Sequence, residues 1–599
     1  MNKISNLLRL YRKIWKLIPS YIIELLLMIV FYAFHPLNGF YFLYRIINGI
    51  ENNYDMWEII QSLCIMFIIE LIYYTIFWSF EKQEKKKIIE IKNKFIFDLQ
   101  QKTINMSFQN LEDPNMSLAQ QKAMEVFYPR QAGYMDLQVT LSCMRVMLST
   151  GIQIMVLGIL FILIDWKLIM FLILFFGISI WLKTIAIDRK FKVWDKKLVQ
   201  IGKRAAYYQE LATNFSYAKE VRLYSLSDWI VEKMHGITKT YIGEINKSVR
   251  DFSVVGIISS ILMGVGVIIT FFQLGYLSWN GQISTANFVS YLNVIRVFES
   301  SLLLAVDMYM VIGQAGSYLQ AYWDYMDQID ITNKEKKISC EQKENSGEVC
   351  FENVYFKYPG AQEYTLKDVS FTIKSGEKVA LVGENGSGKT TLIKLLLRLY
   401  EPESGTIYWK GKDISGITYS EYMEDITAVF QDFKILEDTV ENNILLGKIY
   451  SGNTVKKVLD EVEMSEKIYS LSQGIDSYLG KTMYENGVEL SGGEKQKLAI
   501  ARVLARNVDM VIMDEPTAML SPKVEYEIYT NFAQMVKDKS AIYISHRMSS
   551  CRFCDWIMVL KNGGIDEKGT HEQLMELKGE YYKMYTTQAA FYEKLGENS

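Results

Sequence analysis

The sequence is poor in cysteine, with six among 599 residues. Cys64 and Cys143 lie in long apolar runs, and the other four lie in a C-terminal part that we expect to face the reducing cytosol. We therefore expect no disulfide framework of the kind that staples secreted domains. Cys551 and Cys554 form a C-x-x-C pair, but no second pair accompanies it, so the spacing does not indicate a metal or redox site.

The C-terminal half also lacks a basic stripe, and the formal net charge of the chain is −3. Proteins that bind nucleic acid concentrate Lys and Arg on one face, so we expect no nucleic-acid partner. Apolar residues are abundant instead: they make up 50% of the chain and crowd into long runs before about residue 315. This uneven distribution predicts a membrane part followed by a soluble part.

Several segments are long enough to cross a bilayer, which takes about 20 apolar residues each. The expected spans are Ile18–Tyr44, Met56–Phe80, Leu137–Ile162, Trp166–Ile185, Phe252–Tyr276 and Ala286–Gly313. Long basic connections follow the second and fourth spans, whereas the other connections are short. The positive-inside rule then places both long connections, the N-terminus and the soluble part in the cytoplasm of a cell whose plasma membrane holds the chain.

Helical periodicity continues into the long connections, which predicts helices that extend below the membrane and turn at transverse segments. We expect these segments near Leu111–Met116 and Leu211–Val221; solvated helical hairpins are the alternative. Met1–Lys16 interleaves apolar and basic residues at helical spacing, as in an amphipathic helix on the inner leaflet. The predicted boundaries are 1–325 for the membrane domain, 326–346 for a polar linker, 347–590 for the soluble domain and 591–599 for a tail.

The most informative stretch runs from Lys378 to Tyr400, where an apolar strand, a glycine-rich loop and a Leu-rich helix follow one another. The loop fits G-x-x-x-x-G-K-[ST], whose backbone N–H groups surround a polyphosphate at a helix N-terminus. In this setting Lys389 reaches the β and γ phosphates and the Thr390 hydroxyl ligates Mg²⁺. The predicted ATP-binding residues of the loop are Gly383, Glu384, Asn385, Gly386, Ser387, Gly388, Lys389, Thr390 and Thr391.

Two further motifs follow in the soluble domain. Leu490–Gln496 contains an S-G-G segment that opens a helix, and its Ser491 and Gly493 offer a hydroxyl and an unhindered N–H group to an anion. Met510–Pro516 is an apolar strand that ends in two carboxylates. Asp514 is placed to hold Mg²⁺ through water, and Glu515 is placed to act as general base on the attacking water.

With the loop, the S-G-G segment and the acidic strand in this order, the chain resembles an ATP-binding-cassette (ABC) exporter of the half-transporter type. The resemblance implies an α-helical membrane domain with six transmembrane helices fused to an α/β P-loop NTPase (ABC) domain. It implies that Gln431 contacts Mg²⁺ and the attacking water, that His546 holds the γ-phosphate, and that Tyr358 stacks on adenine. Tyr355 is the alternative aromatic. Glu485 resembles the exporter segment that touches the transverse helices.

The sequence departs from the family at Ser521, where an aspartate usually supports cross-talk between two ATP sites. In the family, Ser491 and Gly493 complete the ATP site of the opposite subunit, so a dimer is implied. Because the hydrolytic residues are all present we favour a homodimer, and Ser521 leaves a heterodimer with a second half-transporter open.

The segment FQNLEDP resembles the corresponding stretch of bacterial lantibiotic and bacteriocin exporters. We therefore expect a bacterial exporter of a modified or signalling peptide that works by alternating access. A lipid or multidrug exporter is the alternative, and an ATP-gated channel or regulatory membrane ATPase is a rival of another class. Ionisable residues inside spans either line a cavity or pair with a neighbouring helix. They are Glu70, Arg145, Arg296, Glu299 and Asp307.

Overall fold

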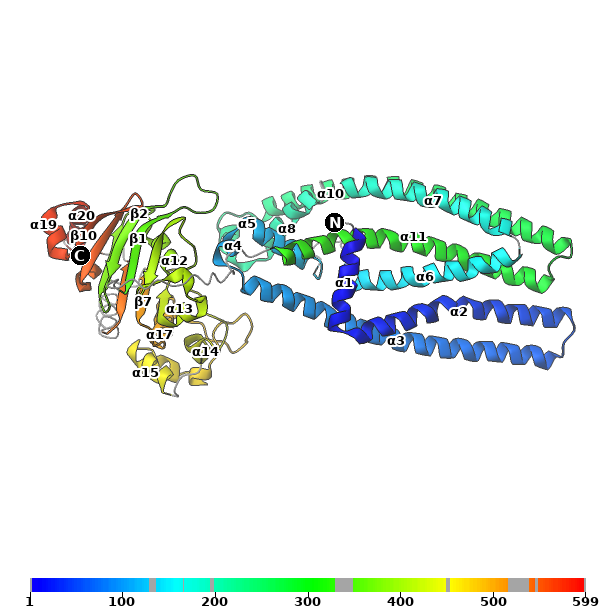
Figure 1. Cartoon of the computed structure of the whole chain (residues 1–599), viewed down its shortest axis with the longest axis horizontal. Coiled ribbons are helices and arrows are strands. Elements are labelled where there is room, and N and C mark those ends of the chain that lie inside the picture. Colours follow the sequence, from blue (N-terminus) through cyan, green and yellow to red (C-terminus); the bar gives the residue numbers. More distant parts are fainter. Residues whose placement is uncertain are drawn as a thin grey trace. The chain divides into compact units, whose positions relative to one another are not determined.

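A computed structural model describes residues 3–128, 136–164, 166–193, 199–328, 348–448, 453–514, 538–544 and 548–596. The chain separates into two compact units (Figure 1). The first unit comprises Met1–Met106 and Leu111–Ile329, and the second comprises Ser107–Asn110 and Asp330–Ser599.

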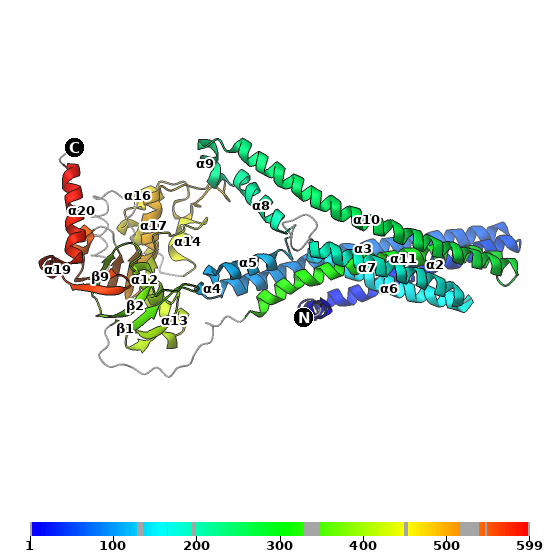
Figure 2. The ribbon, with the colours of Figure 1, turned by 90° about the horizontal axis from the view of Figure 1, so that it is seen from above.

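Helices joined by short connections make up the described residues of the first unit. Its elements are α1 (Lys3–Leu17), α2 (Pro19–Glu51), α3 (Met56–Ile104), α5 (Pro114–Met124), α6 (Leu137–Ile164), α7 (Trp166–Val193), α8 (Val199–Thr213), the 3-10 turn η2 (Phe215–Tyr217), α9 (Ala218–Leu223), α10 (Ser227–Trp279) and α11 (Thr285–Asp327), and the short α4 (Phe108–Glu112) bridges the division between the units. Helix α7 packs along α10, and α6 packs along α11. Figure 2 shows α8, α9 and the start of α10 diverging from α5 and the end of α11.

Within the described residues, five helical segments are long and apolar enough to cross a membrane. They are Pro19–Glu51, Met56–Ile104, Leu137–Leu163, Ser253–Trp279 and Thr285–Ala305. These segments correspond to five of the six expected spans, and the remaining expected span lies in α7, which carries the shorter apolar segment Ile173–Lys183. At 1.5 Å per residue the 49 residues of α3 measure about 74 Å, more than twice a hydrocarbon core of about 30 Å. Helix α3 is therefore much longer than the hydrocarbon core of a bilayer, and its length is consistent with the predicted extension beyond the membrane.

Helix α1 divides its basic residues between two faces. Leu10 and Ile14 are fully buried against the helices of the same unit. The Arg9 guanidinium bonds the carboxylate of Asp327 in a partly exposed pair, and the Lys13 ammonium lies 2.6 Å from the carboxylate of Asp98. The outer face exposes Leu8, Arg12, Trp15 and Lys16. The sequence thus predicts the amphipathic helix, and the structure adds that Arg9 and Lys13 are paired with acidic residues, while Arg12 and Lys16 are exposed.

The second unit contains a six-stranded sheet of order β10-β9-β3-β8-β7-β6 and a four-stranded antiparallel sheet of order β2-β1-β4-β5. Its strands are β1 (Val349–Phe356), β2 (Leu366–Ile373), β3 (Lys378–Gly383), β4 (Ser404–Trp409), β5 (Lys412–Asp413), β6 (Ile426–Val429), β7 (Met510–Asp514), β8 (Ser540–Ile544), β9 (Trp556–Lys561) and β10 (Gly564–Gly569). The helices are α12 (Lys389–Leu396), α13 (Tyr419–Asp425), α14 (Val440–Leu445), α15 (Thr454–Glu461), α16 (Ser465–Tyr469), α17 (Gly492–Leu504), α19 (His571–Leu577) and α20 (Glu580–Gly596), with 3-10 turns η4 (Ile414–Gly416), η5 (Gly474–Asp476) and η6 (Met548–Phe553).

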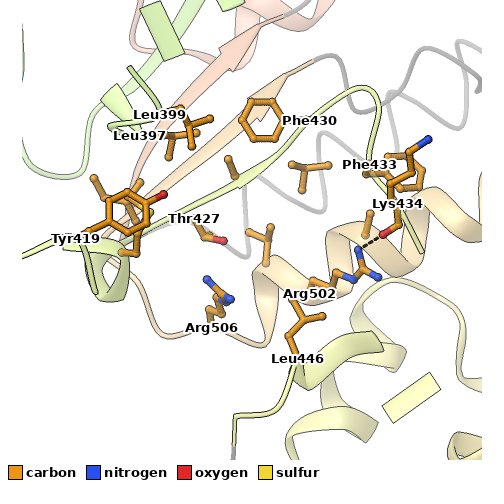
Figure 3. Close-up of a pocket in the computed structure, with 16 residues that line it drawn as sticks. Leu397, Leu399, Tyr419, Thr427, Phe430, Phe433, Lys434, Leu446, Arg502 and Arg506 are labelled. Atoms are coloured by element: carbon orange, nitrogen blue, oxygen red, sulfur yellow. Dashed lines mark hydrogen bonds between the residues drawn. The ribbon is translucent and has the colours of Figure 1, made fainter. Parts of the chain in front are cut away.

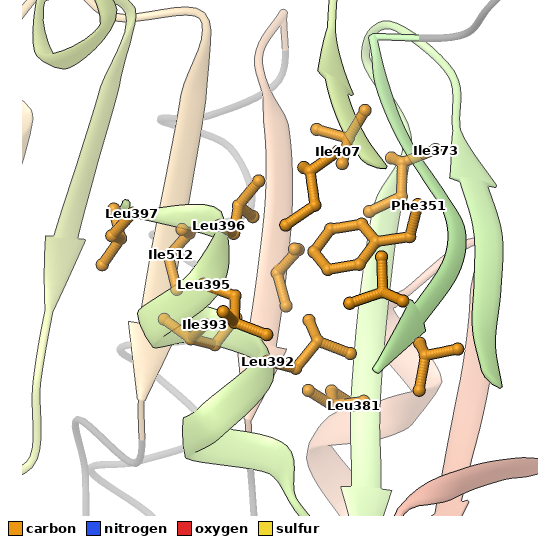
Figure 4. Packing of buried hydrophobic residues seen from close by; sticks show 14 of the residues in the cluster. Phe351, Ile373, Leu381, Leu392, Ile393, Leu395, Leu396, Leu397, Ile407 and Ile512 are labelled. Carbon is orange, nitrogen blue, oxygen red and sulfur yellow. The ribbon is translucent and has the colours of Figure 1, made fainter. Parts of the chain in front are cut away.

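The main core of this unit lies around α12. Figure 4 shows Leu392 and Leu395 of α12 among side chains such as Phe351 of β1 and Ile407 of β4. Val379–Val382 of β3 are all buried, as expected for a short apolar run in a parallel sheet that is covered on both faces. Burial on both faces fixes β3, and therefore fixes where the loop that follows it begins.

Candidate nucleotide-binding site

The glycine-rich loop joins β3 to α12 and lies tightly against neighbouring strands. A Cβ atom on Gly383 would stand 2.3 Å from the backbone oxygen of Leu560, and one on Gly388 would stand 2.6 Å from Cδ2 of Leu366. Gly388 precedes α12 with φ +107°, a conformation that side-chain-bearing residues rarely adopt. Only glycine fits at these two positions, so the loop backbone can turn its N–H groups inward at the helix N-terminus.

The polar groups of the loop suit a polyphosphate. Lys389 is only 6% exposed, and its ammonium donates to the backbone oxygens of Gly383 at 2.8 Å and Glu384 at 3.0 Å. The buried Ser387 hydroxyl has no hydrogen-bond partner among the described residues. A buried hydroxyl without a partner costs about 1–3 kcal/mol, which a phosphate oxygen would recover. These groups and the partial positive charge of the α12 N-terminus form an anion site.

Parallel strands bring the other predicted residues to the same edge of the sheet. The neighbours β6, β7, β8 and β3 run parallel, with Val429 beside Met513, Asp514 beside Ile544, and Leu381 also beside Ile544. Their carboxyl ends therefore share one edge, where ligands of α/β sheets bind. Gly383 and Asp514 lie at this edge, and β6 ends there two residues before Gln431. Asp514 is 5% exposed, and Gln431 is exposed.

Three of the predicted residues cannot be placed from their surroundings. Glu515 follows Asp514 directly and His546 comes two residues after Ile544, but both lie outside the described residues, as does Ser521. The strands that precede Glu515 and His546 in the chain, β7 and β8, end at the same sheet edge as the loop.

The two candidate adenine aromatics have different surroundings. The Tyr358 hydroxyl lies 3.0 Å from the hydroxyl oxygen of Thr391 in α12, and its ring is edge-on to that of Tyr400. Tyr355 lies in β1, and its ring is edge-on to that of Tyr364. Tyr358 is thus the aromatic that the structure ties to the phosphate loop. Within the same unit, the ring of Phe108 also lies edge-on to Tyr400, with centroids 5.9 Å apart.

The S-G-G segment forms the N-terminus of α17. Ser491 is the N-cap residue: its N–H donates to the Glu494 carboxylate at 2.7 Å, and its hydroxyl accepts from the Glu494 N–H at 3.4 Å. The hydrogen bond from the Ser491 backbone lowers the pKa of Glu494, as expected of a carboxylate that caps a helix. Ser491 and Gly492 are exposed, so this helix end is available to a second molecule.

The structure also contains an apolar cavity of about 330 Å³ that the sequence does not predict (Figure 3). Its walls come from β6, α13 and α17, and its lining includes Tyr419, Phe430 and Phe433. Lys434, Arg502 and Arg506 supply its basic groups. No sequence pattern could reveal this cavity, because its lining residues come from elements that are far apart in the chain.

Three of the five ionisable residues predicted in spans are paired within the first unit. Glu70 accepts from Asn38 at 3.0 Å and lies 2.9 Å from His35; Arg145 lies 3.0 Å from Glu84; and Asp307 lies 3.8 Å from Lys183. In the described part of the chain no ion pair joins Arg296 to Glu299, although the two are three residues apart. The first three residues therefore have structural partners, while Arg296 and Glu299 stay candidates for a cavity.

A polar junction between three helices was not predicted from the sequence. Pro36 has no N–H group, so the carbonyl of Tyr32 one turn earlier loses its helical donor. The side-chain amide of Gln153 donates to that carbonyl at 2.9 Å, and Ser301 donates to the Gln153 side-chain oxygen at 2.9 Å. The proline in α2 and the glutamine in α6 are visible in the sequence, but nothing there shows that they meet.

Cys551 of the C-x-x-C pair lies in η6, and Cys554 directly follows the end of this turn. Burial raises the pKa of Cys551 to about 12, and burial also raises the pKa of Cys554 well above its usual range. Thiols with such pKa values stay protonated at neutral pH, so neither is a good nucleophile or metal ligand.

Comparisons with known proteins agree with this geometry. A family model described as ABC transporter matches residues 366–518. The subtilin transport ATP-binding protein SpaT of Bacillus subtilis is 34% identical over 381 residues, which cover 62% of this chain and 61% of that protein. The ATP-dependent lipid A-core flippase of Haemophilus ducreyi is 36% identical over 307 residues, 51% of each chain. The match thus spans about half to three fifths of the length of these relatives.

Among solved structures, a bacterial Atm1-family ABC exporter with ATP bound has a TM-score of 0.75 at 20% identity, over 95% of this chain and 98% of that one. This likeness shows the fold. An ABC domain implies that the site described above binds ATP. Residues 366–518 therefore belong to the ABC transporter family, and the chain is a multi-pass membrane protein with the fold of an ABC exporter half-transporter.

Proposed function

We propose that the chain is one subunit of a dimeric exporter driven by ATP. The observation that carries the proposal is the shared sheet edge: the phosphate loop and Asp514 lie there, in a unit joined to helices that suit a membrane. The fit of a polyphosphate to Lys389 and to the unpartnered Ser387 hydroxyl supports ATP as the ligand.

The proposed roles follow from position. Lys389 holds the β and γ phosphates, and Tyr358 stacks on adenine. Thr390 and Asp514 would hold Mg²⁺, which neutralises charge on the phosphates when bound. Gln431 orients the attacking water, Glu515 accepts its proton, and His546 holds the γ-phosphate.

A dimer is proposed because Ser491 and Gly493 stand at an exposed helix N-terminus. This end suits the γ-phosphate of an ATP molecule that is held by the phosphate loop of a second subunit. Two such contacts would seal two ATP molecules between two chains. We favour a homodimer in the plasma membrane of a bacterium, with the ATPase units in the cytoplasm.

We propose that the cargo is a modified or signalling peptide. The relative from Bacillus subtilis is named for subtilin transport, which supports a peptide. The relative named as a lipid A-core flippase keeps a lipid as the second candidate. Sealing and release of ATP would switch the membrane domain between inward-facing and outward-facing states, and contacts such as that of Phe108 in the ABC unit would help to transmit the change.

The test uses sealed inside-out vesicles that contain the full chain or its Glu515→Gln variant. With the parent we expect ATP-dependent accumulation of labelled subtilin, and with Glu515→Gln we expect no accumulation and an ATP-bound closed dimer that can be cross-linked. A fluorescent phospholipid serves as the second probe, and its movement alone would favour a lipid cargo. Passive flux triggered by ATP binding in Glu515→Gln would indicate a channel. Hydrolysis by Glu515→Gln at the parental rate would show that Glu515 is not the base.

A further inference from the structure

Arg502 connects α17 to the segment that follows Gln431. Its guanidinium donates from Nη1 to the backbone oxygen of Lys434 at 2.6 Å, from Nε to the backbone oxygen of Asn443 at 2.7 Å, and from Nη2 to the Asn443 side-chain oxygen at 2.7 Å. Figure 3 shows Arg502 with its bond to Lys434 at the wall of the cavity. Lys434 is three residues beyond Gln431, so the guanidinium holds the end of the loop that carries this glutamine.

Asn443 completes the connection. It is fully buried, and its side-chain oxygen accepts from the Leu436 N–H at 2.9 Å. Its side-chain nitrogen donates to the backbone oxygens of Leu436 and Thr439, both at 2.9 Å. A buried amide with every hydrogen-bonding group occupied fixes the backbone around it. The segment after Gln431 is therefore fixed to α14 and, through Arg502, to α17.

Apolar packing supports the same connection. Phe433 and Ile435 of this segment pack against a buried cluster that includes Leu498 and Ala501 of α17. The segment and the helix thus share both a hydrogen-bond network and an apolar contact. When packed elements share both, they tend to move together.

The far end of α17 carries the S-G-G segment. From Ser491 to Arg502 the capped helix rises about 16 Å at 1.5 Å per residue. Under the proposed function, Ser491 contacts the ATP molecule held by the partner subunit, whereas Gln431 contacts the ATP molecule held by its own subunit. One helix and one guanidinium thus join two segments that serve different ATP molecules.

We propose that Arg502 and Asn443 are positioning residues that transmit ATP occupancy from one site of the dimer to the other. The inference rests on the proposed function. It supplies a route for cooperativity in a chain where Ser521 replaces the aspartate that usually supports such cross-talk. With two ATP sites, positive cooperativity gives a Hill coefficient between 1 and 2. The coupling requires a structural element with two conformations, whose equilibrium is shifted by ATP at either site.

The first experiment measures ATP hydrolysis against ATP concentration for the full chain in nanodiscs. Arg502→Lys keeps the charge but loses the planar fork that reaches three acceptors. We expect a Hill coefficient above 1 in the parent and of about 1 in Arg502→Lys, with turnover retained. The matched control is Arg506→Lys, which changes another arginine of the same cavity without touching these bonds and should keep the parental coefficient. An unchanged coefficient in Arg502→Lys, or a coefficient of 1 in a parent that hydrolyses ATP, overturns the inference.

A second measurement decides the question if Arg502→Lys turns over too slowly. The Leu436 amide donates to Asn443, so its hydrogen exchange reports on the segment after Gln431. We expect ATP to slow this exchange, and we expect Ser491→Ala to reduce the slowing by ATP. In the Arg502→Lys background, Ser491→Ala should cause no further reduction. An equal effect of Ser491→Ala in both backgrounds would make Arg502 purely structural. A parent that neither hydrolyses ATP nor moves cargo would refute the proposed function instead.

Discussion

Gly388→Ala should weaken ATP binding without unfolding the protein. At φ +107° an alanine costs about 1–3 kcal/mol of backbone strain. Its Cβ atom would also stand 2.6 Å from a Leu366 methyl group and 3.2 Å from the Thr365 backbone oxygen. The leucine methyl group can move, but the backbone oxygen cannot move easily, so the ligand-free loop will relax into another conformation. ATP binding must then restore the original loop, and we expect affinity to fall by about 5- to 150-fold.

Equilibrium binding of a fluorescent ATP analogue to the full chain in nanodiscs measures this loss. The control is Gly376→Ala, which has φ +79° and open space around the new Cβ atom. Gly376 lies before β3, at the end of the strand away from the loop. This control should lower stability by a similar strain and leave affinity unchanged. Parental affinity in Gly388→Ala, or an equal loss in both variants, would refute the argument that the loop is held by its close fit.

Two further substitutions test contacts found only in the structure. Gln153→Leu removes the donor to the Tyr32 carbonyl, which should cost about 1–3 kcal/mol of stability in thermal unfolding in detergent. Adding Pro36→Ala to this variant should recover most of the loss, because it restores the helical N–H group. No recovery in the double variant would contradict the assignment of this contact. Burial lowers the pKa of His571, which lies 2.8 Å from the Tyr581 hydroxyl. The unfolded chain then takes up this proton at a higher pH than the folded chain, so stability is complete above about pH 6.5 and is lost as the pH falls through the folded pKa. When unfolding is followed between pH 7.5 and 5.5, His571→Gln should lose less stability than the parent as the pH falls. An unchanged dependence of stability on pH would show that this histidine is not its source.

The predicted first transverse segment, near Leu111–Met116, contains a break between two helices. The short helix α4 (Phe108–Glu112) ends there and α5 starts at Pro114. Asp113 caps that new helix by accepting from the Asn115 N–H at 2.8 Å, and proline at the first helical position completes the signal. The Asp-Pro pair is visible in the sequence, so this helix start is a local signal.

The sequence alone determined the phosphate loop, the S-G-G helix start and five helical segments that are long and apolar enough to cross a membrane. These features depend on residues that are close together in the chain: glycine spacing, a capping serine, or a run of apolar side chains. Short-range patterns of this kind predict local structure independently of the tertiary contacts.

Only the tertiary structure decided which polar groups meet. Basic residues at helical spacing predict a basic face on α1, but whether Arg9 forms an ion pair depends on Asp327, more than 300 positions away. The partners of Arg145 and Arg502 are likewise distant in sequence, at Glu84 and Asn443. A charged or amide side chain is stabilised inside a protein only where a partner satisfies it, and the location of that partner is a property of the packed helices and strands, not of the local sequence.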